Sequence, residues 1–170
     1  AAQGPTSANL ATSNGFWLKD GDDKSKWSVA DGTLLFSGAE FLDLQMYNVK
    51  GYSVKEDFVL SFSFKPISEN LSSQHLVDWR RDGQGTMDSM QVQLLDGCIY
   101  LAGKNCGKLP VNDWTLIELA FEYDEELKMF KNVSLLLNGT VVHTTTVSED
   151  ALLTQIKHFR MLRYMASNSF

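Results

Sequence analysis

The sequence is short of positive charge. Lysine and arginine together number 15 against 21 aspartates and glutamates, which gives the 170-residue chain a net charge of −6. This balance argues against a nucleic-acid binder, because such a protein needs a concentrated basic surface to displace counterions. Hydrophobic residues make up 44% and charged residues 21%, which is typical of one soluble globular domain with a full core.

Long hydrophobic runs are also missing. No apolar stretch approaches the roughly 18 residues of a membrane-spanning helix, so membrane insertion is not expected. The opening segment, AAQGPTSANLATSNG, is small and polar and is not typical of a signal peptide, which has a basic region before an apolar one. We expect residues 1–15 to form a flexible segment and residues 16–170 to form a single domain.

Cysteine is scarce, and the spacing of Cys98 and Cys106 is not the CxxC of metal or redox sites. In CIYLAGKNC a turn at Gly-Lys-Asn could place the two across a hairpin, so we predict a disulfide; two free, partly buried thiols are the alternative. Asn-X-Ser/Thr sequons are weak evidence for a glycosylated, secreted or surface-exposed protein, and they begin at Asn70, Asn132 and Asn138.

Helical signals are rare, whereas alternation of apolar and polar residues is frequent. The alternation predicts strands within residues 57–66, 89–97 and 113–124, each with one face toward a core. The inward positions on these strands are Phe58, Leu60, Phe62, Phe64, Met90, Val92, Leu94, Ile117, Leu119, Phe121 and Tyr123.

Two dipeptides predict tight hairpins, Asp31-Gly32 and Asn138-Gly139, because both of their positions tolerate positive φ. Only residues 148–156 have a helical pattern, which begins at a plausible N-cap, Ser148, and predicts one or two turns. A last strand is expected at residues 157–165. So many strands with one apolar face each predict an all-β protein, a two-sheet antiparallel jelly-roll sandwich.

One long stretch resembles a known family. In LPVNDWTLIELAFEYDEELKMFKNVSLLLNGTVV a tryptophan opens a strand, an acidic loop follows, and the next strand ends in Asn-Gly. Together with YSVKEDFVLSFSFKP, DSMQVQLLDGCIYLAG and QIKHFRML, it is similar to the laminin G-like branch of the concanavalin A-like lectin/glucanase superfamily, over roughly residues 52–164. The resemblance implies a curved sandwich, usually secreted, that binds glycans or protein partners, with Trp114 in a structural role.

The resemblance also implies a calcium site. Laminin G-like domains often hold Ca²⁺ at the sandwich rim through an aspartate just before a strand, and Asp88 occupies that position. Asp82, across the Gly83-Gln84-Gly85 turn, could supply a second carboxylate, since Ca²⁺ takes six to eight oxygen ligands. The alternative is that Asp82 and Asp88 only form the turn.

The segment from 78 to 88 is the best candidate for ligand binding. An exposed indole stacks on the C–H groups of a sugar, and guanidinium groups bind carboxylates or sulfates in a bidentate manner. In the alternative, Trp79 faces the core and the arginines are solvated. The candidate ligand-binding residues are Asp78, Trp79, Arg80, Arg81 and Gln84.

Catalytic motifs are absent. Glycoside hydrolases need two carboxylates flanking the bond, and Glu118 and Glu122 share a strand face without a third partner or an aromatic-lined cleft. We therefore predict a non-catalytic recognition module whose partner is a carbohydrate bound through rim loops. The alternative is a protein–protein adhesion domain without sugar affinity, binding an extracellular protein; a hydrolase or lyase is disfavoured.

Overall fold

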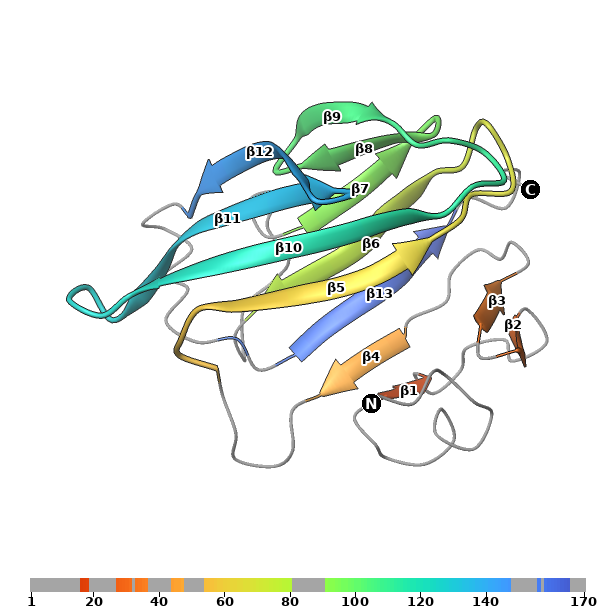
Figure 1. Ribbon diagram of the computed structural model, residues 1–170. Coiled ribbons are helices and arrows are strands. Elements are labelled where there is room, and N and C mark those ends of the chain that lie inside the picture. The colour runs from red at the N-terminus through yellow and green to blue at the C-terminus, as the bar shows by residue number, and fades with distance from the viewer. Residues whose placement is uncertain are drawn as a thin grey trace.

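The computed structural model describes residues 16–18, 27–31, 33–36, 44–47, 54–80, 91–147, 156 and 158–165. These residues form strands in two sheets and a separate hairpin (Figure 1). In spatial order, the larger sheet contains β1 (Phe16–Leu18), β4 (Leu44–Tyr47), β13 (His158–Met165), β6 (Ser73–Arg80), β7 (Gln91–Leu95), β8 (Cys98–Leu101) and β9 (Lys104–Lys108). The smaller sheet contains β12 (Thr140–Thr146), β11 (Met129–Leu137), β10 (Thr115–Asp124) and β5 (Phe58–Phe64), and the hairpin consists of β2 (Trp27–Ala30) and β3 (Thr33–Phe36).

The architecture is an all-β sandwich, as predicted. Every paired strand runs antiparallel to its neighbour, and buried apolar side chains of both sheets form one core. Figure 1 shows the smaller sheet lying across the larger one. Such face-to-face packing seals the apolar side of each sheet and leaves its other side for contacts with solvent or ligands.

The predicted alternation is confirmed along β10. Ile117, Leu119 and Phe121 are buried, while Glu122 is exposed. In register, Leu119 lies between Leu60 of β5 and Leu135 of β11, so each inward position of the central strand meets apolar neighbours on both sides. Phe58, Leu60, Phe62, Phe64 and Tyr123 are partly buried against the same core.

Aromatic rings tie the two sheets together. Phe121 of β10 stacks on Phe58 of β5, with ring centroids 4.5 Å apart, and meets the edge of Trp79 from β6 at 5.2 Å. Phe130 of β11 packs edge-on against Phe58 at 5.8 Å. Because Trp79 comes from the larger sheet and Phe121 from the smaller one, their contact fixes how the two layers meet.

The predicted hairpins are present. Asn138 and Gly139 both have positive φ, 50° and 82°, in the turn between β11 and β12. Asp31, with φ 51°, follows β2, and Ala30 pairs with Thr33 across that turn. The turn residues therefore match the left-handed backbone that these hairpins require.

The predicted disulfide is wrong. Cys98 and Cys106 are free, because the turn falls at Ala102-Gly103 and a register shift then places Cys98 opposite Lys108. Cys106 packs partly against the core, whereas Cys98 alternates with the buried Ile99 and so lies on the outer face of the sheet. The two thiols are therefore on opposite faces and cannot be joined.

Near the C-terminus, the structure confirms the last strand as β13. Most of the predicted helix, residues 148–155, lies outside the described residues, but Ile156 forms a β-bridge with Val54 instead of a helical turn. The expected flexible segment, residues 1–15, also lies outside them. In the part that the structure describes, no helix is long and apolar enough to cross a bilayer.

Candidate functional site

Two residues of the predicted binding loop are in the wrong place for that role. Trp79 is 0% exposed against Phe121, and Asp78 is also fully buried. The reason is the position of β6, which is an interior strand between β13 and β7 and ends at Arg80. The proposed stacking of a ligand on Trp79 is therefore incorrect, as is direct contact with Asp78. Arg80 is the last residue of β6, and its side chain is outside the part that the structure describes. The remaining predicted residues, Arg81, Asp82, Gln84 and Asp88, lie outside the described residues altogether.

Asp78 belongs to a buried polar cluster. Its Oδ2 lies 3.6 Å from Nδ1 of His75, and both side chains are buried. Asp78 also pairs in register with Gln91 of β7, which is buried too. This cluster lies within the sheet, where a solvent-borne ligand does not reach it.

A solvent-accessible polar surface lies on the outer face of the larger sheet, near its β9 edge. Ile99 and Leu101 are fully buried, so alternation along β8 turns Tyr100 outward. Gln93 of β7 is the register partner of Tyr100 on one side, and Asn105 of β9 is its partner on the other. These three residues form a row across three strands, and we call this row the Tyr100 surface.

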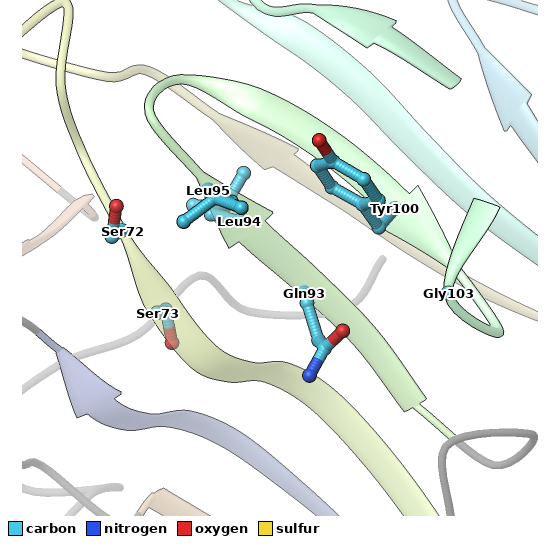
Figure 2. Close-up of a pocket in the computed structure, with 7 residues that line it drawn as sticks. All are labelled: Ser72, Ser73, Gln93, Leu94, Leu95, Tyr100 and Gly103. Carbon is cyan, nitrogen blue, oxygen red and sulfur yellow. The ribbon is translucent and has the colours of Figure 1, made fainter. Parts of the chain in front are cut away.

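A shallow pocket of about 390 Å³ adjoins this row (Figure 2). Gln93 and Tyr100 contribute to its wall, and Leu95 adds an exposed apolar side chain. The pocket combines an aromatic ring with amide and hydroxyl groups, which can stack on and hydrogen-bond a small polar ligand. Its lining consists of Ser72, Ser73, Gln93, Leu94, Leu95, Tyr100 and Gly103.

Hydrogen bonds orient the polar groups of the Tyr100 surface. Nδ2 of Asn105 donates to the Tyr100 hydroxyl at 3.4 Å, and Oδ1 of Asn105 accepts from the Gly107 N–H at 2.9 Å. The Asn105 amide is thus fixed at both ends, and the Tyr100 hydroxyl receives a donor that leaves its own proton available for a ligand. Lys108, exposed and opposite Cys98 in the adjacent row, adds a positive charge beside this site.

The floor of the pocket is equally well anchored. Oγ of Ser72 accepts from the Asp96 N–H at 3.0 Å, and the Gly97 N–H donates to the Leu71 carbonyl at 3.0 Å. These bonds join the start of β6 to the turn between β7 and β8. The pocket wall is therefore held by strands and their turns, which favours a preformed binding surface.

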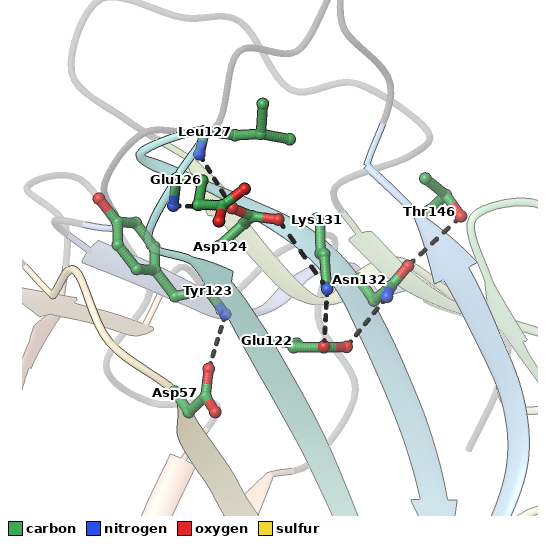
Figure 3. A network of polar contacts seen from close by, with 9 residues as sticks. All are labelled: Asp57, Glu122, Tyr123, Asp124, Glu126, Leu127, Lys131, Asn132 and Thr146. Carbon is green, nitrogen blue, oxygen red and sulfur yellow. Dashed lines mark hydrogen bonds and ion pairs between the residues drawn. The ribbon is translucent and has the colours of Figure 1, made fainter.

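The carboxylates of β10 do not have the geometry of a glycosidase pair. Glu118 and Glu122 are four residues apart on one strand, or about 13 Å, more than the roughly 5–9.5 Å that separates the carboxyl groups in such enzymes. Figure 3 shows Glu122 bonded to Asn132 at 2.9 Å and to Lys131 at 3.1 Å. The hydrogen bond from Asn132, followed by that from Lys131, lowers the pKa of Glu122, the reverse of what a general acid requires.

The calcium prediction has not been tested, because Asp82 and Asp88 lie outside the described residues. Within the described residues, no group of three or more histidine, cysteine, aspartate or glutamate side chains could hold a metal ion.

The three sequons differ in their surroundings. Asn70 and Asn138 are exposed, and Oδ1 of Asn138 accepts from the Leu116 N–H at 2.8 Å, which leaves Nδ2 for a glycan. Nδ2 of Asn132 instead donates to Glu122. Asn70 and Asn138 are therefore the more suitable acceptors.

The sequence analysis missed Tyr100, Gln93 and Asn105, although one signal was present. Alternation along QVQLL and CIYL already places Gln93 and Tyr100 opposite the apolar positions. Trp114 was also misjudged: it is 48% exposed, and the alternation that buries Ile117 and Phe121 turns it outward.

Comparisons with known proteins match structures and not sequences. No protein-family model matches the chain, and no curated protein matches its sequence. A solved chain named sialidase is 12% identical with a TM-score of 0.66, covering 92% of this chain and 14% of that one. The endo-β-1,4-glucuronan lyase of the fungus Trichoderma reesei is 15% identical with a TM-score of 0.51, covering 92% of this chain and 81% of the lyase. This chain shares their β-sandwich fold, and it spans only 14% of the length of the sialidase.

Proposed function

We propose that this chain is a non-catalytic carbohydrate-recognition module of the laminin G-like, concanavalin A-like kind, which binds a saccharide on the Tyr100 surface. The observation that carries the proposal is the row of Gln93, Tyr100 and Asn105 beside a preformed pocket. The tyrosine ring offers an apolar face to the C–H groups of a sugar, while the amides and the hydroxyl bond its hydroxyl groups.

The names of the matched proteins support a saccharide ligand. Both the sialidase and the glucuronan lyase are named for action on saccharides, and both contain a sandwich of this fold. The absence of catalysis is supported by Glu122, whose carboxylate is held in an ion pair with Lys131. Incubation with neutral and acidic polysaccharides is expected to show no turnover above that of a Glu118→Gln, Glu122→Gln variant, and turnover well above it would make the module an enzyme.

Binding is tested on an array of neutral and acidic glycans, with and without Ca²⁺. Tyr100→Ala is expected to weaken binding at least tenfold. Tyr100→Phe keeps the ring and loses one hydrogen bond of about 0.5–1.5 kcal/mol, which corresponds to roughly 2- to 12-fold. Leu127→Ala, at an exposed position between β10 and β11, is the control and is expected to bind normally.

Unchanged binding by Tyr100→Ala would refute the assigned site. A blank array together with recovery of a specific protein partner would favour the adhesion alternative. The predicted calcium site would be supported if a chelator removed binding, if added Ca²⁺ restored it, and if Asp88→Asn did not bind even with Ca²⁺ present.

We also propose that the module acts outside the cell or on its surface. Exposed sequons at Asn70 and Asn138 support this location. Expression through a eukaryotic secretory pathway is expected to add glycans at these positions, seen as a mass reduced by glycosidase and by Asn70→Gln or Asn138→Gln. A chain secreted without any glycan would remove this support.

A further inference from the structure

The outer face of the smaller sheet carries an exposed aromatic residue beside a cation. Phe64 pairs with Thr115, and the next position along brings Lys65 beside Trp114. Nζ of Lys65 lies over the indole, 5.3 Å from the ring centroid. Leu116, two residues further on the same face, is 38% exposed. We call Lys65, Asp113, Trp114 and Leu116 the Trp114 platform.

The backbone that carries this platform is fixed on both sides. The Asn112 N–H donates to the Pro66 carbonyl at 2.8 Å, joining the chain before β10 to the end of β5. The Leu116 N–H donates to Oδ1 of Asn138, and the Asn138 N–H donates to the Leu116 carbonyl at 2.9 Å. The indole is therefore presented by a braced strand end, so little ordering is required when a ligand binds.

The chemistry of the platform favours a saccharide over a protein partner. Indole and Leu116 provide an apolar area. Lys65, whose Nζ lies over the ring, supplies a charged donor, and exposed Asp113, whose Oδ1 accepts the Trp114 N–H at 2.9 Å, supplies a carboxylate at the start of the strand. A pyranose ring offers the same combination, an apolar C–H face with hydroxyl groups on its rim. The adjoining outer positions of β5, Ser61 and Ser63, are exposed and polar. Charged and polar groups set this close to the indole suit a saccharide better than the centre of a protein interface, which is depleted of charged residues.

We propose that the Trp114 platform is a second saccharide site, which takes neutral pyranosides because Asp113 and Glu118, near the indole, outnumber Lys65 and do not favour an acidic sugar. It lies on the outer face of the smaller sheet, whereas the Tyr100 surface lies on the outer face of the larger one. Since the two sheets pack face to face, the two sites point in opposite directions. The module therefore bridges two glycan chains, a consequence that rests on the proposed function of the Tyr100 surface.

The platform is tested by calorimetric titration of the intact chain with cellohexaose, mannohexaose and xylohexaose. Trp114→Ala is expected to weaken hexasaccharide binding at the platform at least tenfold. The titration then loses one binding event, and any binding at the Tyr100 surface remains. Trp114→Phe keeps a stacking ring and is expected to retain most of the affinity, and Lys65→Gln to lose severalfold. A single cooperative unfolding transition well above the titration temperature in each variant confirms that the fold is intact.

Bridging is measured as turbidity with a soluble polysaccharide of the sugar that binds. The wild type is expected to cross-link it, and Trp114→Ala and Tyr100→Ala each to bind without cross-linking. The platform would be overturned if Trp114→Ala gave the same titration curves as the wild type, or if the wild type bound none of the hexasaccharides. In either case, binding of acidic glycans through Tyr100 would still uphold the proposed function. Binding abolished by Trp114→Ala and unaffected by Tyr100→Ala would uphold the platform and refute both the Tyr100 site and bridging.

Discussion

Trp79→Ala is expected to destabilise the protein strongly, although Trp79 was a candidate ligand contact. The side chain is fully buried and meets Phe121 edge-on at 5.2 Å across the two sheets. Truncation of a buried tryptophan costs about 3–5 kcal/mol, from the lost burial and the cavity that remains. For a chain of this size, this corresponds to a fall in Tm of roughly 6–20 °C.

Trp114→Ala is the matched control. Its indole is half-exposed and contacts Lys65. The lost half-burial and the lost cation–π contact together should cost about 1–2.5 kcal/mol, less than for Trp79 because no enclosed cavity remains. Urea unfolding followed by far-UV circular dichroism measures both variants on the same scale. Equal losses for the two variants, or a loss below about 1 kcal/mol for Trp79→Ala, would refute the assignment of Trp79 to the core and of Trp114 to the surface.

Three further predictions concern turns, thiols and pH. Gly97→Ala is expected to lower the free energy of unfolding in urea by about 2–5 kcal/mol, because φ is +77° and a Cβ would lie 2.5 Å from the Glu69 carbonyl oxygen. Gly139→Ala has φ +82° but open space around it, so it should lower this free energy by only about 1–2 kcal/mol. Equal losses for the two variants would contradict the clash at Gly97. Thiol titration without reductant should find both cysteines free. Cys106 should react more slowly than Cys98, because burial raises the pKa of its thiol. A Tm lowered by reductant would instead indicate a disulfide. The Asn132 and Lys131 hydrogen bonds lower the pKa of Glu122, so the ionised carboxylate should stabilise the fold at neutral pH and lose this effect as the pH falls below the ordinary value of 4.5. The urea midpoints of Glu122→Gln and the wild type should therefore converge in acid. A difference that stays constant with pH would count against the pairing.

Local alternation was enough to predict the smaller sheet. Along β5 and β10, the inward positions from Phe58 to Phe62 each meet an apolar neighbour in register, as for Phe62 opposite Ile117, so the sequence pattern and the tertiary contacts agree. The turn at Asn138-Gly139 follows from the backbone preference of the dipeptide alone.

The larger sheet was harder to predict, because β6 is buried on both faces. Leu76, Val77, Asp78 and Trp79 are successive residues with no exposure, and the strand lies inside the sheet beside β13, which comes about 80 residues later in the chain. Such a strand loses the alternation that separates core from surface. The candidate loop was consequently placed beside a tryptophan that belongs to the core.

The cysteines failed for a different reason. A register shift in the short β8–β9 hairpin places Cys98 opposite Lys108, and no local pattern in CIYLAGKNC predicts it. The Tyr100 surface depends instead on the turn at Ala102-Gly103, which pairs Tyr100 with Asn105 before the shift occurs. The outward positions of Gln93 and Tyr100 follow from alternation in the sequence, but the contact of Tyr100 with Asn105 depends on strand pairing.

Beyond Phe58, β10 and β11 continue as a two-stranded ribbon. Its last paired positions, Tyr123 and Asp124, have partners only on β11, and the carboxylate of Asp57 accepts the Tyr123 N–H at 2.7 Å where β5 is no longer present. The ribbon ends in a turn at which Leu127 is 65% exposed. Figure 1 shows this turn projecting past the end of β5. A fluorophore or affinity tag inserted there would lie at the opposite end of β10 from Trp114, about 33 Å along the strand, and would report on glycan capture without obstructing it.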